Sequence, residues 1–589
     1  MQNRLQQCGI VCKTLNFGEA GQFYFHTTYG DLGESEEDLV LKLGFARSSD
    51  SVSLSAVELL RSKLLSPRAV AVDELRGNAI LICLSKVQPE FLIYKTLLAP
   101  QPLCFTEVMG EILCSTSQRC LLHLLDEVVL NEDVLPYHFI FQFVPGHLTY
   151  YRNVRRLFPG QRLHWHAGRL DVKRVRDLRF QDARQVKRLD KHAADRVYDV
   201  IKAVVGSYIG DVSRSGHRVA SLLSGGVDSG IVQVIVNACH ANPDQRPPSF
   251  SYRVIVPGFD IEDQYARQAS KMLKTQHSTC PIRPEDLPGI IERTTEAVAQ
   301  PIPHEADACK FALAEFLAAH DTSRYFLSGQ VADGLYGLGL ARKIAIYELV
   351  KNVPAARHVA AFLAKVVKPG SARVASGLKD LAVAMTATDD PADFNHWLNS
   401  LGIFMDLAIA RRSFGDESIR NVQAHRRELE HQYLDSNNLT EKLHAAELIT
   451  MSYEPAEFGT QIFLSQKKQL ICPYADEDII RNAHSFAPAI RFVKPGFGFW
   501  RRDNTKHLLK TILVNRSYGD IALKAKGGSS FDADLFVMMK KGALTDMTQA
   551  IERPSFLSRA DFEALLRKPD YFLWSLLTFD TFKKRVLSR

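Results

Sequence analysis

A short glycine-rich stretch carries the residues best suited to bind a phosphate. It lies between an apolar run ending at Leu223 and another at 231–236, a pattern typical of strand, turn and helix. Glycines let the backbone approach an anion, hydroxyls donate to it, and unpaired N–H groups at a helix start face it. An acidic residue there favours Mg²⁺ carried on a nucleotide, because a bare carboxylate would repel the phosphate. The candidate residues are Ser224, Gly225, Gly226, Val227, Asp228 and Ser229.

This stretch differs from the Gly-x-x-x-x-Gly-Lys-Ser/Thr loop of the common NTPases, because it contains no lysine. Its Ser-Gly-Gly-Val-Asp-Ser order instead resembles the pyrophosphate loop of ATP pyrophosphatases, which split ATP into AMP and pyrophosphate while adenylating a substrate. An ordinary glycine turn is the alternative, and the strand–turn–helix context counts against it. The resemblance implies ATP and Mg²⁺ as cofactors.

A second glycine turn with a lone acid follows the apolar run 325–327. It resembles the Ser-Gly-Glu-Gly-Ser-Asp stretch of the asparagine synthetase family, whose aspartate shares the pyrophosphate-bound Mg²⁺ with the loop aspartate. Ligands of α/β sheets lie at the carboxyl ends of adjacent strands. We therefore predict Asp228 and Asp333 as metal ligands, and Ser328 and Gly329 as pyrophosphate contacts.

Two lysines match further motifs of the same family. The range 506–510 resembles its Lys-x-x-Leu-Arg motif and the range 524–528 its Arg-x-Lys-x-Gly motif, while 471–476 resembles Pro-Phe-Leu-Asp. The resemblance implies that Lys526 contacts the acyl-adenylate, where a fixed cation stabilises developing negative charge. Lys506 is the second catalytic candidate.

Gln330 departs from the family pattern. Asparagine synthetases carry Glu at this position and β-lactam synthetases carry Tyr, which belongs to a base assembly. Glutamine cannot act as a general base, so the base must come from elsewhere. Tyr336, His304 and Glu305 are the candidates, and the sequence does not choose among them.

The N-terminal part reads mainly as β-structure, with short apolar runs that include 79–84, 91–94 and 138–144. The range 149–163 resembles the signature that closes the glutaminase-like domain of asparagine synthetases. That glutaminase uses a cysteine whose own free amine is the base, whereas this chain has Gln2 and its first cysteine is Cys8. We expect this domain to be an inactive glutaminase.

The expected fold class is α/β with two domains. Residues 1–178 should form an inactive glutaminase-like (Ntn-type) α+β sandwich, and 179–211 a connecting helix. Residues 212–589 should form an α/β ATP-pyrophosphatase domain with a parallel sheet and added helices, since strands and helices alternate there.

Composition narrows the class of protein. The 589 residues carry a formal charge of only +7, which does not indicate nucleic acid as a partner. The sequence contains no run of 18 apolar residues, so no membrane span is predicted. The ten cysteines include no Cys-x-x-Cys pair. A cytoplasmic protein is expected.

The family resemblance implies an ATP-dependent ligase that adenylates a carboxylate and lets an amine displace AMP. The range 526–531 looks most like the macrolactam synthetases of lasso-peptide pathways, which favours lactam formation and a role in antibiotic biosynthesis. A β-lactam synthetase, an ammonia-dependent asparagine-synthetase-like enzyme and a non-catalytic scaffold stay open. The expected partner is a peptide or small molecule with a carboxylate and an amine, together with a precursor peptide and a pathway protease.

Overall fold

The computed structural model describes most of the chain. The described residues are 13–16, 22–25, 30–50, 52–108, 111–177, 186, 192–240, 242, 246–256, 260–337, 404–431, 448–491, 506–523 and 532–588. Gln2, Cys8 and Lys526 lie outside them.

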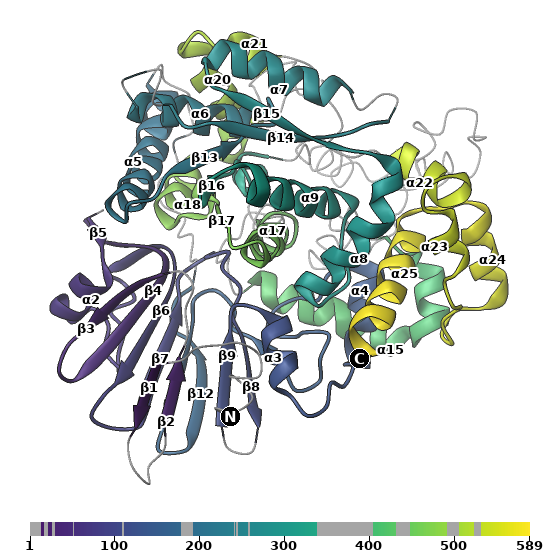
Figure 1. Ribbon diagram of the computed structural model, residues 1–589, viewed down its shortest axis with the longest axis horizontal. Helices are drawn as coiled ribbons and strands as arrows, with labels where there is room; N and C mark the ends of the chain where they lie inside the picture. Colours follow the sequence, from purple (N-terminus) through teal and green to yellow (C-terminus); the bar gives the residue numbers. More distant parts are fainter. Residues whose placement is uncertain are drawn as a thin grey trace, which may run out of the picture.

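Antiparallel sheets make up the N-terminal part, which lies in the lower half of Figure 1. The largest has seven strands in the order β12-β11-β7-β6-β4-β3, with β5 paired to β4. A three-stranded sheet, β10-β8-β9, and a β1-β2 hairpin accompany it. The strands are β1 Lys13–Asn16, β2 Gln22–Phe25, β3 Asp31–Glu34, β4 Asp38–Ser48, β5 Ser53–Leu54, β6 Leu75–Ser85, β7 Glu90–Lys95, β8 Cys104–Val108, β9 Glu111–Ser115, β10 Arg155–Arg156, β11 Gln161–His166 and β12 Arg169–Arg174.

The strands β4, β6 and β7 of the seven-stranded sheet are buried on both faces, since successive side chains of a strand point to opposite sides and nearly all of them are buried. On one face of β4, Leu39, Leu41 and Leu43 pack in a cluster with Phe105 of β8 and with Leu103, which directly precedes β8. Val40 and Ala46 of the same strand pack on the other face, in a cluster with Ala56 and Leu59 of helix α2 Ala56–Ser62. The antiparallel part therefore has its own layered core.

One predicted strand is wrong. The range 138–144 overlaps helix α4, Leu135–Phe141, not a strand. Pro136 suits the first turn of a helix, and every residue from Pro136 to Phe141 is buried. A short run that is apolar all round has no periodicity that separates helix from strand.

A five-stranded parallel sheet forms the centre of the second half, in the order β15-β14-β13-β16-β17. Helices pack against this sheet in the upper half of Figure 1, and the expected mixed α/β class is confirmed. The strands are β13 Val219–Leu222, β14 Ser249–Val254, β15 His277–Ile282, β16 Tyr325–Leu327 and β17 Gln469–Ile471.

The other helices surround the parallel sheet or extend from it. Within the helix predicted for 179–211, the described helix begins at Ala193 and continues to Arg214, with Val212 still buried. The helices are α3 Gln118–Leu124, α5 Ala193–Arg214, α6 Val227–Cys239, α7 Asp260–Leu273, α8 Leu287–Val298, α9 Glu305–His320, α10 Ala332–Tyr336, α15 Leu407–His431, α17 Glu454–Ser465, α18 Glu477–His484, α19 Pro488–Arg491, α20 His507–Asn515, α21 Gly519–Leu523, α22 Asp532–Lys541, α23 Thr545–Gln549, α24 Arg559–Arg567 and α25 Tyr571–Phe582, with short helices at η2 Glu132–Val134, η4 Pro284–Asp286, η6 Leu448–Tyr453, η7 Pro473–Ala475 and η9 Lys583–Leu587.

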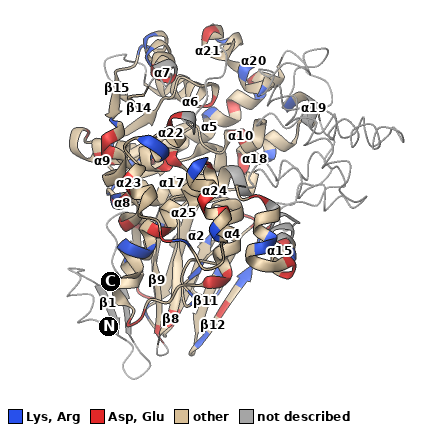
Figure 2. Ribbon diagram, turned by 90° about the vertical axis from the view of Figure 1, so that its right-hand side faces the viewer, with Lys and Arg blue, Asp and Glu red and all other residues tan. Residues whose placement is uncertain are grey.

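Charge is spread over the surface. In the view of Figure 2, basic and acidic residues are interspersed along the described helices and strands. Among the described residues, no helix is both long and apolar enough to cross a membrane.

Candidate functional site

The first glycine turn joins β13 to α6. Gly225 has a positive φ of 75°, and a Cβ there would lie 2.4 Å from the carbonyl carbon of Tyr265. Only glycine therefore fits the close approach of this turn to α7. Gly226 has an extended conformation and caps α6, so the N–H groups of the first helical turn lie at the end of β13.

Hydroxyl groups line the same turn. Ser224 Oγ lies 3.2 Å from Ser229 Oγ and accepts a hydrogen bond of 3.3 Å from the Gly226 N–H. The turn thus combines backbone donors with hydroxyls at a helix start, the arrangement expected of an anion site. Val227 is the first residue of α6, and Asp228 follows it in the first turn.

The second glycine turn touches the first. It follows β16, which pairs directly with β13 in the parallel sheet. A Cβ on Gly329 would lie 2.7 Å from the backbone nitrogen of Ser229 and 2.9 Å from Asp228 Cβ. Ser328 is buried, and its N–H donates to the carbonyl of Ile471 at 2.8 Å. The predicted pyrophosphate residues of both turns are therefore neighbours.

Asp228, Asp333 and Lys506 converge at these turns. The Lys506 ammonium lies 2.5 Å from Asp228 Oδ2 and 2.6 Å from Asp333 Oδ1. Burial lowers the pKa of Lys506, but the charges of Asp228 and Asp333 outweigh that effect and raise it. The two carboxylates predicted to share a cation are thus held around one positive charge.

Exposure differs within this trio. The side chain of Asp333 is 37% exposed, that of Asp228 18% and that of Lys506 10%. Two carboxylates and one ammonium leave a formal charge of −1, on the side where solvent reaches Asp333. A surplus negative charge of this kind attracts cations.

The three base candidates lie in two places: Tyr336 is in α10, three residues after Asp333, whereas His304 and Glu305 are at the start of α9. Tyr336 is fully buried against Tyr474, and burial raises the pKa of its hydroxyl. His304 caps α9, lies 3.1 Å from Glu305 and stacks on Tyr571 of α25. The identity of a general base stays open.

Two contacts of the site were not predicted from the sequence. The Tyr474 hydroxyl donates to the backbone carbonyl of Asp228 at 3.3 Å, across 246 residues. Lys506 joins the two aspartates directly, whereas the sequence assigned it only as the second lysine candidate. The motif-like range 471–476 was the available signal for Tyr474, although it indicated no partner.

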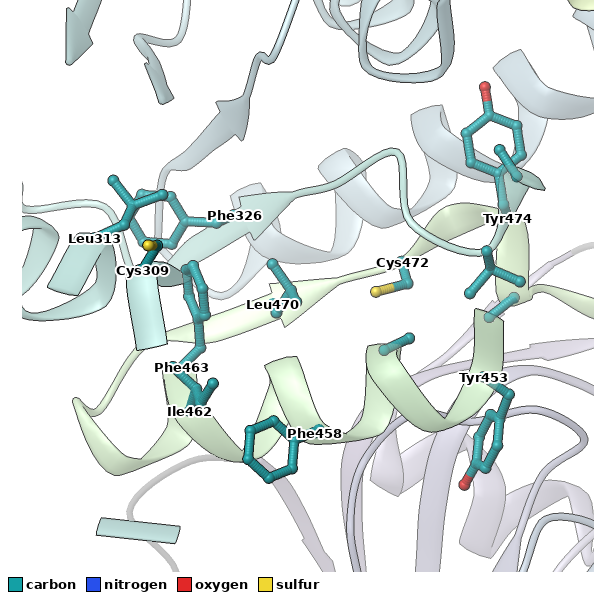
Figure 3. Packing of buried hydrophobic residues seen from close by; sticks show 14 of the residues in the cluster. Cys309, Leu313, Phe326, Tyr453, Phe458, Ile462, Phe463, Leu470, Cys472 and Tyr474 are labelled. Atoms are coloured by element: carbon teal, nitrogen blue, oxygen red, sulfur yellow. The ribbon is translucent and has the colours of Figure 1, made fainter. Parts of the chain in front are cut away.

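The turns rest on a packed layer. Figure 3 shows Leu470 in β17 and Cys472 and Tyr474 after it, with Phe326 of β16 on one side and α17 on the other. Phe463 of α17 stacks at a tilt against Phe326, with ring centroids 5.8 Å apart. Packing against α17 thereby supports the strand that carries the second turn.

Neighbouring parallel strands that end in acidic glycine turns are typical of nucleotide-binding α/β proteins. The model of the family described as asparagine synthase matches residues 210–584, and the chain belongs to the asparagine synthase family. Members of this family are ATP-dependent carbon–nitrogen ligases that form AMP and pyrophosphate.

The chain is also similar to a curated protein, asparagine synthetase [glutamine-hydrolyzing] 1 of Bacillus subtilis (strain 168). The two are 23% identical over 313 residues, which is 52% of this chain and 45% of that protein. The matched part therefore spans less than half the length of the relative.

Proposed function

We propose that this chain is an ATP-dependent amide synthetase that closes a ring within its substrate. A substrate carboxylate oxygen attacks the α-phosphorus of ATP, the bond to pyrophosphate breaks, and an acyl-adenylate forms. A substrate amine then attacks the acyl carbon, AMP leaves with the electrons of the C–O bond, and the amine loses a proton. The convergence of Asp228, Asp333 and Lys506 at two glycine turns carries this proposal.

The residues fit Mg²⁺ and the phosphates of ATP. Asp228 and Asp333 both contact the Lys506 ammonium, at 2.5 and 2.6 Å, which supports the proposal that the pair would hold one divalent ion. Such an ion would supply positive charge to the pyrophosphate. The N–H groups that open α6 would bind phosphate oxygens. Lys506 would add positive charge to the same group.

Gln330 supports ring closure over amidation by ammonia. Its side chain is a neutral amide whose Oε1 lies 3.9 Å from Cys472 Sγ, so it cannot supply the carboxylate of the ammonia-using relatives. We favour a peptide substrate and a lasso-type macrolactam, for which a precursor peptide and a protease would be partners. A small β-lactam precursor is the second candidate substrate, since both rings form by the same two steps.

The test is a product analysis with three kinds of substrate. The protein is incubated with Mg·ATP and a peptide that carries an N-terminal amine and an acidic side chain, a small β-amino acid, or aspartate with ammonium. Ring closure releases pyrophosphate and removes one water from the substrate, whereas amidation exchanges a hydroxyl for an amine. Pyrophosphate release only with aspartate and ammonium would overturn ring closure, and release with no carboxylate at all would overturn the synthetase.

A further inference from the structure

The N-terminal sheet holds a segment that supports both glycine turns. This support segment, residues 471–478, runs from the end of β17 through η7 into α18. Arg47 of β4 reaches it, with its Nη2 2.5 Å from Asp476 Oδ1 and 2.8 Å from Asp478 Oδ2. Asn78 of β6 donates to the carbonyl oxygen of Cys472 at 3.1 Å.

Further side chains fix the same segment. Arg176 donates to Glu477 at 2.6 Å, and the Tyr208 hydroxyl of α5 donates to Asp476 Oδ2 at 2.5 Å. The Tyr208 ring stacks on Phe45 of β4, with centroids 4.5 Å apart. The contact between the N-terminal sheet and the support segment is therefore built from directional bonds as well as from packing.

These bonds are buried. The side chain of Arg47 is 1% exposed and that of Asp476 0%. Asp476 also accepts from the Asp478 N–H at 3.0 Å and caps α18. A buried guanidinium–carboxylate bond keeps its geometry, because neither group can exchange its partner for water.

The other side of the support segment contacts the site. Its first residue, Ile471, accepts the Ser328 N–H, and its Tyr474 hydroxyl donates to the Asp228 carbonyl oxygen. Tyr474 is two residues before Asp476. A continuous series of hydrogen bonds and covalent bonds therefore joins Arg47 to the turn that carries Asp228.

We propose that Arg47 is a positioning residue of the nucleotide site, through which the N-terminal sheet sets the geometry of the turn at Asp228. This role rests on the proposed function only in that ATP binds at these turns. The antiparallel N-terminal part would then serve the synthetase reaction by holding its nucleotide turn in place.

The experiment measures binding of Mg·α,β-methylene-ATP to the full chain by calorimetry, which needs no knowledge of the substrate. Arg47→Met should weaken affinity about tenfold, equivalent to about 1.4 kcal/mol, in protein shown by circular dichroism to be folded at the assay temperature. Arg47→Lys keeps the charge but loses the planar fork, so it should restore affinity in part. Arg68→Met is a surface control, since the Arg68 side chain is 67% exposed and pairs with Glu90 of β7, and it should bind like the wild type.

A double-mutant cycle separates positioning from general support. Tyr474→Phe removes only the hydroxyl and should weaken binding about threefold. If Arg47 acts through Tyr474, the double variant should lose about tenfold rather than about thirtyfold, because contacts in one series are not additive. If Arg47→Met does not fold, the Asn78→Ala variant, which removes the bond to Cys472, takes its place in the cycle.

The outcomes are distinct. No binding to the wild type would contradict the proposed function itself. Wild-type affinity in folded Arg47→Met, or losses that multiply in the double variant, would overturn the positioning role while leaving the synthetase proposal intact.

Discussion

Two clusters of paired acidic and basic side chains in this chain differ in their net formal charge and in their exposure to solvent. At the glycine turns, Asp228, Asp333 and Lys506 carry a formal −1, and Asp333 is 37% exposed. Between the N-terminal sheets and α17, two basic and two acidic residues are balanced, with no side chain more than 9% exposed. The members of this interface cluster are Lys95, Arg156, Glu454 and Glu457.

The interface cluster satisfies its charges internally. Glu457 accepts from Lys95 at 2.5 Å, from Arg156 at 2.6 Å and from Tyr453 at 2.8 Å. Burial raises the pKa of Glu457, but Lys95 and Arg156 outweigh that effect and hold the pKa below its usual range. The comparison teaches that pairing alone does not mark a binding site. Exposure to solvent and a surplus of formal charge distinguish the cluster at the glycine turns from the interface cluster.

The largest expected effect is at the site. Asp228→Asn should lower ATP-dependent AMP formation by at least about 10³-fold, because charge neutralisation by a bound metal contributes several kcal/mol to catalysis. Asp333→Asn should behave in the same way. The thermal midpoint should stay near that of the wild type, since each substitution removes the surplus negative charge of the trio and leaves Lys506 one carboxylate partner. Near-normal turnover in either variant would remove the metal assignment.

The next effect is on folding and falls on the interface cluster. Lys95→Met should lower the free energy of unfolding by about 3–5 kcal/mol, because it leaves a buried carboxylate short of its partner. Urea unfolding measures this loss. Replacing both partners, Lys95→Met with Glu457→Leu, should recover most of the stability, and nucleotide affinity of the folded single variant should be unchanged. A single variant as stable as the wild type would show that the cluster is not held as described.

Lys526, which is outside the described residues, remains a sequence-based prediction. Lys526→Ala should lower turnover about 10²–10³-fold with a smaller change in ATP affinity, as expected for a cation that acts on the developing charge. Arginine should rescue in part. Steady-state kinetics with ATP as the varied substrate tests this, and full turnover in Lys526→Ala would pass the role to Lys506.

Lys506→Ala offers the contrast to Lys526, because its ammonium contacts both aspartates. We expect it to weaken binding of Mg·α,β-methylene-ATP by about tenfold, equivalent to about 1.4 kcal/mol. Calorimetry measures the change. Unaltered affinity would indicate that Lys506 only holds the aspartates together before nucleotide binds.

A further effect concerns the pH dependence of stability. Burial lowers the pKa of His138 to about 4, below an unfolded value of about 6.5. The folded state therefore resists protonation, so this stability is fully present above about pH 6.5 and is lost as pH falls toward 4. At pH 5 the free energy of unfolding should be about 2 kcal/mol lower than at neutral pH because of this histidine. Urea unfolding at several pH values measures the loss, which should be absent from His138→Gln. An equally steep loss in that variant would assign the effect to other groups.

Short sequence patterns predicted those parts of the site that are formed by residues close together in the sequence. Both turns, their strands and the convergence of Asp228 with Asp333 followed from residue order, because parallel strands bring their carboxyl ends to one edge. The strand predicted at 138–144 was wrong, since a segment that is buried on all sides shows no periodicity in its apolar residues. Arg47 carried no signal, because its partner lies 429 residues away and nothing in a strand sequence distinguishes a buried arginine from an exposed one.

The central claim is that the two aspartates hold a cation on a bound nucleotide. Its most direct test is calorimetric binding of α,β-methylene-ATP to the full chain with and without Mg²⁺. The account predicts at least about tenfold tighter binding with Mg²⁺ in the wild type, equivalent to about 1.4 kcal/mol, and loss of that gain in Asp228→Asn. Equal affinity with and without Mg²⁺, or a gain that survives in Asp228→Asn, would contradict it.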